Sequence, residues 1–280
     1  MSVYRGTTAL VTGAASGIGL ALSRGLIARG AEVWLTDVDG AAVEAAARRL
    51  GDRAHGAGLD VTDAEAVDEA VRAIDEARGG LGYLFNNAGL GLAGEVHELG
   101  VRHFDRTLDV NVRGVTNGVA AAYPRMVDRG RGHIVNTASA AGLLPVPLLS
   151  AYAMSKHAVV GLSASLRLEA EHHGVQVSVL CPTAIETPLL DGGRAPEPSQ
   201  AWRPELRRYL GRVGGAPRPV DDFVDAALRG VAANRGTIVW PTRARVAVAL
   251  SRLAPALALR LGRRALAQER RDRPPTGQAR

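Results

Sequence analysis

Apolar runs with the composition of buried strands alternate six times with helical stretches in this 280-residue chain. The predicted strands are 7–13, 31–37, 81–89, 133–139 and 175–182, with a further strand in 54–63 that ends at Asp60, after which Thr62 or Asp63 caps the next helix. The predicted helices are 13–30, 40–50, 64–78, about 103–129 and 151–173. A helix at 218–236 and a strand at 237–240 follow. Such alternation predicts a parallel sheet with helices on both faces. We therefore expect a single α/β domain with a doubly wound sheet of about seven strands.

A glycine-rich junction follows the first predicted strand. Gly13, Gly17 and Gly19 lie between that strand and the next helical stretch, in the strand–turn–helix context of a dinucleotide site. Glycines let the backbone approach a pyrophosphate, and a helix N-terminus supplies free N–H groups and positive potential. The spacing is G-x-x-x-G-x-G rather than the G-x-G-x-x-G of other dinucleotide folds. The context favours a dinucleotide site over a plain tight turn.

The second predicted strand ends in an acid, Asp37. A carboxylate at this position can accept both hydroxyls of an adenosine ribose, and it repels a 2′-phosphate. The segments 13–19 and 37–42 contain no lysine or arginine that would bind such a phosphate. The sequence therefore predicts NAD as the cofactor and disfavours NADP.

Candidate catalytic residues lie between positions 136 and 156. Tyr152 and Lys156 are four residues apart, so a helix would place them on one face, and Ser139 ends the fifth predicted strand. A fixed ammonium near a phenol favours the phenolate, so we expect Lys156 to lower the pKa of Tyr152. The alternative is a Ser-rich loop that leads into an ordinary surface helix.

Lysine usage favours the functional interpretation of this segment. Of the 34 lysines and arginines in the chain, only Lys156 is a lysine. In a chain that uses arginine for its other cations, a single lysine indicates a position that needs a compact ammonium, because a guanidinium fork does not replace it.

Together these segments resemble the short-chain dehydrogenase/reductase (SDR) family over about residues 5–240. The matching pieces are TGAASGIG at 12–19, Asp60 in LDVTD, NNAG at 86–89, Asn111, Ser139 and YAMSK at 152–156. The resemblance implies a Rossmann-type fold and a catalytic tetrad of Asn111, Ser139, Tyr152 and Lys156. It also implies contacts with the dinucleotide from Gly13, Ser16, Gly17, Ile18, Gly19, Asp37, Asp60, Val61, Asn87, Ala88, Gly89, Tyr152, Lys156, Pro182, Ile185 and Thr187. In this set Asp60 would contact the adenine, and Thr187 would help to hold the nicotinamide amide.

The activity that the resemblance implies is NAD-dependent interconversion of a secondary alcohol and a ketone. Tyr152 would be the general acid/base, and Lys156 would lower its pKa and bond the nicotinamide ribose. Ser139 would polarise the carbonyl, while Asn111 would hold a water that relays protons. Two other classes stay open: enoyl reduction or epimerisation at the same site, and a dinucleotide-sensing regulator that turns over poorly.

The substrate side is expected to be apolar. In the family, segment 188–218 is a mobile substrate lid, and here it is rich in Pro and Gly with a short helical patch near 203–211. The family commonly has Pro-Gly after the sixth strand, whereas this chain has Pro182-Thr183, which narrows the wall near the nicotinamide. A lipophilic or cyclic substrate is favoured over a sugar or small acid by the expected pocket residues, which are Leu92, Leu143, Leu144, Val146, Leu149, Ile185 and Leu189.

Charge and composition disfavour several other classes. Residues 241–280 hold ten arginines and two acids, which leaves 24 of the 34 basic and 26 of the 28 acidic residues in a nearly neutral body. Nucleic-acid binding by that body is therefore disfavoured. The single cysteine, Cys181, allows no intrachain disulfide and fits a cytoplasmic protein. We expect no metal site, no signal peptide and no membrane-spanning helix.

Residues 241–280 are expected to form a basic, helical C-terminal extension beyond the 1–240 domain. Apolar residues recur there every three or four positions, at Val246, Leu250, Leu253, Leu257 and Leu261. Pro255 predicts that the helical segment is divided into two helices, and the residues after about 270 are predicted to be disordered. Two interpretations of the apolar stripe stay open. In the first, it docks on the protein's own body or on a partner subunit. In the second, residues 241–270 rest on an anionic membrane surface.

We also expect a homotetramer or a homodimer. In the family the helices that correspond to 103–129 and 151–173 pair across a twofold axis. Both segments are richer in Ala, Val and Leu than one sheet face requires.

Overall fold

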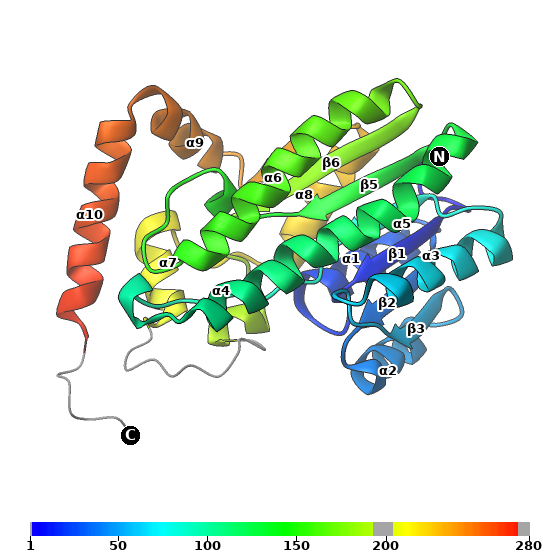
Figure 1. Ribbon diagram of the computed structural model, residues 1–280, viewed down its shortest axis with the longest axis horizontal. Helices are drawn as coiled ribbons and strands as arrows, with labels where there is room; N and C mark the ends of the chain where they lie inside the picture. Colours follow the sequence, from blue (N-terminus) through cyan, green and yellow to red (C-terminus); the bar gives the residue numbers. More distant parts are fainter. Residues whose placement is uncertain (1, 193–203, 274–280) are drawn as a thin grey trace.

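The computed structural model describes residues 2–192 and 204–273. Within these residues one sheet of seven parallel strands has the order β3-β2-β1-β4-β5-β6-β7. The strands are β1 (Thr8–Thr12), β2 (Glu32–Asp37), β3 (Ala54–Gly58), β4 (Tyr83–Asn86), β5 (Gly132–Thr137), β6 (Val175–Pro182) and β7 (Thr237–Trp240). Helices cover both faces of the sheet (Figure 1). The predicted doubly wound parallel sheet is therefore confirmed.

The helices follow the predicted alternation. They are α1 (Gly17–Ala28), α2 (Gly40–Leu50), α3 (Ala64–Arg78), α4 (Val101–Leu108), α5 (Gly114–Arg129), α6 (Ser150–Glu171), α7 (Leu206–Gly214), α8 (Val220–Ala232), α9 (Ala244–Leu253) and α10 (Pro255–Arg271). Short helical turns are η1 (Val96–Glu98), η3 (Ala140–Gly142) and η4 (Pro188–Asp191), and η2 (Asp109–Arg113) is a π-helical turn.

Alternate residues of the central strands pack into two separate layers. Val11 and Phe85 lie in one buried cluster with residues of α1, α2 and α8. Their neighbours Leu10 and Leu84 lie in a second cluster with residues of α3, α5 and α6. Because both faces of the sheet are buried, its strands appear in the sequence as nearly continuous apolar runs.

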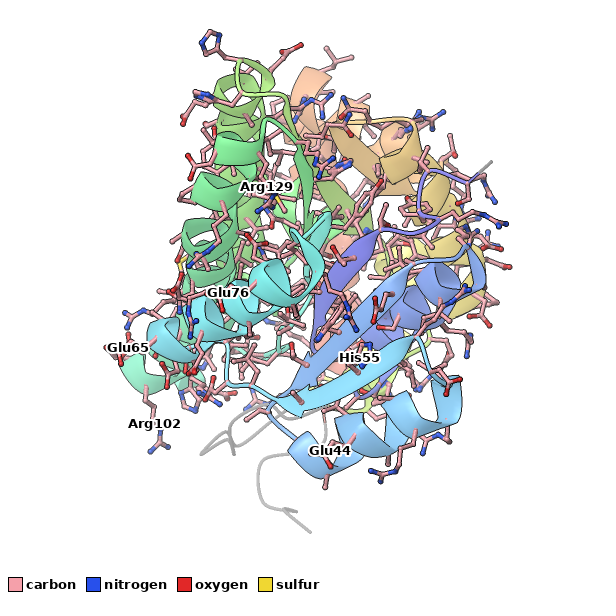
Figure 2. The ribbon with its side chains drawn as sticks, turned by 90° about the vertical axis from the view of Figure 1, so that its right-hand side faces the viewer. Glu44, His55, Glu65, Glu76, Arg102 and Arg129 are labelled. Atoms are coloured by element: carbon pink, nitrogen blue, oxygen red, sulfur yellow. The ribbon has the colours of Figure 1, made fainter. Side chains whose placement is uncertain are left out.

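The edge strand β3 ends at Gly58, two residues before the predicted strand end at Asp60. Figure 2 shows β3, which carries His55, lying beside α2, which carries Glu44. A Cβ on Gly56 would lie 2.8 Å from the Cα of Glu44, so a glycine is needed for this close packing. After Gly58 the chain turns toward α3, and Asp63 caps that helix by accepting bonds from the N–H groups of its first turn.

Two predicted helices differ from the structure at points that matter for the site. The first begins at Gly17 rather than at 13, because the residues between β1 and α1 form a turn. The predicted helix 103–129 is interrupted by the π-helical turn η2, in which Asn111 is buried. Such turns rotate the following part of a helix and often occur at functional sites.

The C-terminal extension forms two helices, α9 and α10, which meet at the predicted break before Pro255. Glu269 near the end of α10 is fully buried. Its two carboxylate oxygens accept hydrogen bonds from Arg208 (2.8 Å) and Arg212 (2.7 Å) of α7. This end of α10 is therefore fixed to α7.

Further ion pairs join α10 to the segment around η1. Arg270 donates two hydrogen bonds to Glu95, at 2.6 and 2.9 Å, and Arg273 donates one to Glu98 at 2.6 Å. The extension thus docks on the protein's own body. Helix α10 runs to Arg271, and residues 274–280 of the expected disordered tail lie outside the described residues. Among the described helices, none has the length and apolar character needed to cross a bilayer.

We expect Glu269→Gln to loosen α10, because the variant leaves Arg208 and Arg212 around a neutral side chain. Loss of one partner of a buried pair lowers the free energy of local opening by about 3 kcal/mol. The α10 amides should then exchange their hydrogens roughly a hundredfold faster. The matched control is Glu205→Gln, whose carboxylate contacts the same Arg208 at 3.2 Å but is 62% exposed. It should change exchange by less than about tenfold. Equal effects of the two variants would show that Glu269 does not hold the helix.

Candidate functional site

The glycine-rich turn and the end of β4 are held together by Thr12. Its hydroxyl oxygen accepts hydrogen bonds from the backbone N–H groups of Asn87 and Ala88, both at 2.9 Å. In return, the side-chain amide of Asn87 donates to the carbonyls of Thr12 (3.0 Å) and Gly13 (3.3 Å). These bonds join the sequence motifs at 12–19 and 86–89 where the strand order reverses, which is where ligands bind in open α/β sheets.

The glycines of this turn have no room for side chains. Gly13 has a φ of +64°, and a Cβ on it would lie 2.7 Å from the Cα of Ala88. A Cβ on Gly19 would overlap the carbonyl oxygen of Gly13. Helix α1 begins at Gly17, and the side chain of its N-cap residue Ser16 makes no capping bond. The first N–H groups of α1 therefore lack a side-chain cap and suit a phosphate.

Asp37 is positioned at the end of β2 by two backbone N–H groups. One carboxylate oxygen accepts from Ala15 and the other from Asp39, both at 3.1 Å. Asp37 also lines the cavity, and an ionised carboxylate is the type of acceptor that ribose hydroxyls require. Nearby, the Asp60 carboxylate accepts from the backbone N–H of Thr62 (2.9 Å), which holds the pKa of Asp60 below its usual value.

One cavity of about 1180 Å³ runs from these residues to the candidate catalytic residues. Every residue that the family resemblance assigned to the cofactor lines it except Gly19, which packs behind the turn. The cradle, the uncapped helix start and the acid at the end of β2 have the geometry and charge that a dinucleotide requires. The residues present therefore fit a nicotinamide dinucleotide.

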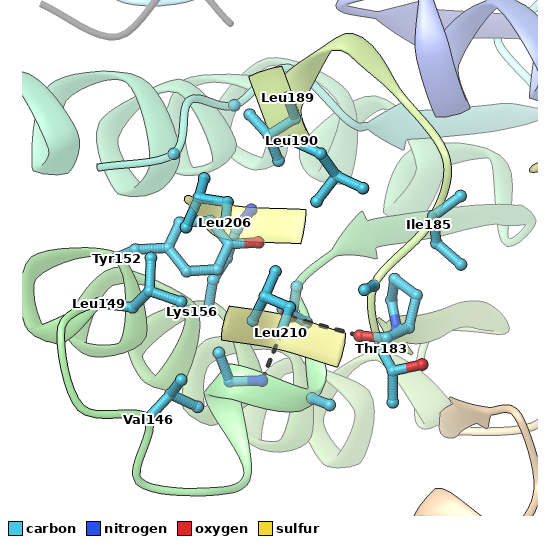
Figure 3. Close-up of a pocket in the computed structure, with 18 of the residues that line it drawn as sticks. Val146, Leu149, Tyr152, Lys156, Thr183, Ile185, Leu189, Leu190, Leu206 and Leu210 are labelled. Atoms are coloured by element: carbon cyan, nitrogen blue, oxygen red, sulfur yellow. Dashed lines mark hydrogen bonds between the residues drawn. The ribbon is translucent and has the colours of Figure 1, made fainter. Parts of the chain in front are cut away.

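The candidate catalytic residues lie at the ends of β5 and α6. Ser139 precedes η3, and its hydroxyl accepts from the backbone N–H of Ala141 at 3.1 Å. Tyr152 and Lys156 lie one turn apart on α6, with the Lys156 ammonium 5.7 Å from the centre of the Tyr152 ring. Figure 3 shows the Tyr152 hydroxyl directed into the cavity, with Lys156 beside its ring.

The expected lowering of the Tyr152 pKa is wrong for the cofactor-free protein. Burial raises the pKa of Tyr152, and a hydrogen bond with Ser139 opposes this only in part. Burial also lowers the pKa of Lys156 from 10.5 to about 8. The Lys156 side chain is 3% exposed and donates to the carbonyl of Thr137 at 2.8 Å. The effect of burial on both groups outweighs the attraction between phenolate and ammonium on which the prediction was based.

Asn111 lies behind the cavity wall, and the π-helical turn positions its side chain. Its amide nitrogen donates to the carbonyl of Leu90 and to the hydroxyl of Ser155, both at 3.0 Å. Its amide oxygen accepts from the backbone N–H of Leu90 at 2.8 Å. A Cβ on Gly89 would lie 3.2 Å from this oxygen and 3.4 Å from the Lys156 nitrogen. Asn111 and Lys156 thus border one small space that a glycine leaves open.

Sequence reasoning missed the residues that support this arrangement. Thr12 and Ser155 carry the bonds between motifs, and neither was proposed. A signal for Thr12 was available, because a polar β-branched residue directly follows the apolar run 9–11. Ser155 lies inside the YAMSK segment, where its hydroxyl accepts from Asn111 and donates to the carbonyl of Tyr152 at 2.7 Å.

The substrate side of the cavity is apolar but differs in part from the prediction. Predicted residues that line it are Leu144, Val146, Leu149, Ile185 and Leu189, together with Thr183 after Pro182. Leu92 is instead buried, and Leu143 packs against a core cluster. The lid helix α7 adds Leu206 and Leu210, which face Tyr152 (Figure 3). The expected stripe of the extension is divided, since Leu250 and Leu261 line the cavity while Leu253 is 86% exposed.

We expect no tyrosine of the folded, cofactor-free protein to ionise below pH 10. Burial raises the pKa of Tyr152, and it likewise raises those of Tyr4, Tyr83, Tyr123 and Tyr209. The midpoint of the absorbance increase that accompanies phenolate formation should therefore lie above pH 10 for every tyrosine. An ionisation below pH 10 that is present in the wild type and absent in Tyr152→Phe would mean that Lys156 lowers the pKa without the cofactor.

Comparison with known proteins relates this site to a family. The family model of short chain dehydrogenases matches residues 7–197. The probable oxidoreductase EphD of Mycobacterium tuberculosis is 40% identical over 237 residues, which are 81% of this chain. The chain spans about two fifths of the length of EphD, since only 40% of that protein is covered.

A second relative and a solved structure agree with this assignment. The 2,5-dichloro-2,5-cyclohexadiene-1,4-diol dehydrogenase of Sphingobium indicum is 39% identical over 192 residues, which cover 68% of this chain and 77% of that protein. A crystal structure of an SDR from Burkholderia phymatum in complex with NAD superposes with a TM-score of 0.83 and 32% identity, covering 92% of this chain and 96% of the other. The chain therefore belongs to the short-chain dehydrogenase/reductase family of oxidoreductases.

Proposed function

We propose that the protein interconverts a secondary alcohol and a ketone with NAD, on a lipophilic or cyclic substrate. The observation that carries this proposal is the shared cavity. The same cavity is bordered by Ser139, Tyr152 and Lys156 and by the glycine cradle with Asp37. A relative that is named for a cyclic diol, and an apolar substrate side, favour this substrate class.

In this proposal Tyr152 moves the proton. Its phenol donates to the carbonyl oxygen during reduction, and its phenolate accepts the alcohol proton during oxidation. Ser139 holds the same oxygen through a hydrogen bond, which favours its partial negative charge in the transition state. NAD, when bound, supplies the redox partner for the carbinol carbon.

Lys156 and Asn111 have supporting roles in this proposal. The buried Lys156 ammonium holds the ribose hydroxyls, and these additional hydrogen bonds favour its charged form. The Asn111 oxygen has an acceptor position left after its bond to Leu90, and it borders the same space as the Lys156 nitrogen. A water there would pass protons from Lys156 toward solvent.

Other reactions at this site are enoyl reduction and epimerisation, and a regulator would bind NAD but turn over poorly. The proximity of Ser139 to the Tyr152 hydroxyl favours carbonyl chemistry, because both groups can bond one oxygen atom. A panel of secondary alcohols, enones and epimerisable alcohols, assayed with NAD or NADH, separates the classes. Binding of NADH without turnover of any panel member would favour the regulator.

We also propose that the protein assembles as a homodimer or homotetramer through α4–α5 and α6. The support is exposed apolar surface on α6, where Leu168 is 75% and Met154 42% exposed. Light scattering at micromolar concentration tests the proposal.

Tyr152→Phe should lower kcat by at least about a hundredfold, because it removes the general acid/base. Binding of NADH, followed by fluorescence titration, should stay unchanged. The control is Tyr123→Phe on α5, which removes a hydroxyl far from the cavity and should retain activity. Normal turnover by Tyr152→Phe would exclude the proposed proton donor.

NAD should bind at least about tenfold more tightly than NADP, because a 2′-phosphate beside Asp37 costs at least about 1.4 kcal/mol. Asp37→Asn should reduce that ratio, since it removes the charge and retains one acceptor oxygen. The control is Asp39→Asn, two residues away, which alters the N-cap of α2 and does not line the cavity. Equal dissociation constants of the wild type for the two nucleotides would refute the preference.

A further inference from the structure

The cavity continues beyond Tyr152 into a region bordered by the three helices α7, α9 and α10. We call this region the vestibule. Its apolar wall residues include Leu210 and Val213 of α7, Leu250 of α9, and Ala258, Leu261 and Ala265 of α10, and the polar side chains of Arg212, Ser251, Arg264 and Gln268 also border the cavity. In Figure 1, α9 and α10 lie at one side of the molecule, next to α7 and away from the nucleotide half of the sheet.

The vestibule walls carry apolar surface that the described protein does not cover. Leu261 is 47% and Val213 41% exposed, although both line the cavity. Covering such surface with an apolar group is favourable, because it removes the surface from water. Among the described residues that line the cavity, Tyr152 is the only aromatic one. Leu, Val and Ala side chains suit a flexible aliphatic chain, and they offer no ring on which an aromatic substrate could stack.

The open space depends on small residues and on a fixed helix. Ala258, Gly262 and Ala265 are spaced by four and three positions, so they form one narrow strip of α10 that borders the cavity. A Cβ on Gly262 would lie 3.9 Å from Pro147, so α10 closes against the loop before α6. The bonds of Glu269 to α7 keep this strip in place.

We propose that the vestibule binds the aliphatic tail of the substrate. The secondary alcohol or ketone lies at Tyr152, and a chain of several methylene groups extends between α7, α9 and α10. This inference rests on the proposed function, which determines the end of the substrate that reacts. It narrows the lipophilic substrate class to compounds with an extended alkyl or acyl chain.

Binding of methyl ketones tests the vestibule without turnover. The probes are 2-butanone and 2-decanone, titrated by calorimetry into the Tyr152→Phe protein loaded with NADH. We expect the dissociation constant to fall about two- to fourfold for each methylene group, as burial of a CH₂ group predicts. Leu261→Asn in the same background should weaken 2-decanone by at least about fivefold and leave 2-butanone unchanged.

The control for that variant is Leu253→Asn on α9, which makes the same substitution at a residue that is 86% exposed and outside the cavity. It should change the affinity of neither ketone. Equal dissociation constants for the two ketones, or equal effects of Leu261→Asn and Leu253→Asn, would overturn the proposal.

Turnover by the wild type separates this inference from the function on which it rests. Chain-length-dependent binding together with no oxidation of any 2-alkanol would support the vestibule and refute the alcohol dehydrogenase function. Oxidation of 2-butanol and 2-decanol with the same kcat/KM would support that function and refute the vestibule.

Discussion

The contact between the β1–α1 turn and the end of β4 is the constraint on which the site depends. Chain connections leave β1 and β4 in opposite directions along the sheet, so a crevice opens between their carboxyl ends. One hydroxyl, that of Thr12, accepts two backbone N–H groups there and fixes the width of the crevice. The approach of Gly13 to Ala88 leaves no room for a Cβ, so glycine at this position follows from geometry.

The second half of the site depends on how two helices meet beneath this crevice. The π-helical turn brings Asn111 to the backbone of Leu90 on one side and to Ser155 of α6 on the other. Ser155 in turn bonds the carbonyl of Tyr152. The segment after β4, the helix pair α4–α5 and the helix that carries Tyr152 and Lys156 are thus connected through one amide. A shift of any of these elements would move the candidate proton donor relative to the nucleotide side.

Most of the fold could be predicted from the sequence, but only part of the site could. The strands were predictable because both faces of the sheet are buried, which leaves apolar runs such as 175–182 that match β6. The π-helical turn was not predictable, because DVNVRG has ordinary helical residues and the extra residue is fixed by contacts with Leu90 and Ser155. The pKa of Tyr152 was predicted in the wrong direction, since sequence spacing reports which charge is near but not how deeply both groups are buried.

The charged residues of the arginine-rich C-terminal extension form ion pairs with the rest of the protein. Its only acids, Glu269 and Asp272, contact arginines of α7, while Arg270 and Arg273 contact Glu95 and Glu98. Exposed pairs contribute little on their own, so the buried Glu269 is the stronger constraint. The ion pairs lie at the C-terminal end of α10. The break before Pro255 and the exposed Leu253, which ends α9, lie at the opposite end of that helix. The C-terminal end of the extension is therefore fixed, and the apolar walls that α10 adds to the cavity, at Ala258, Leu261 and Ala265, lie between that end and the break before Pro255.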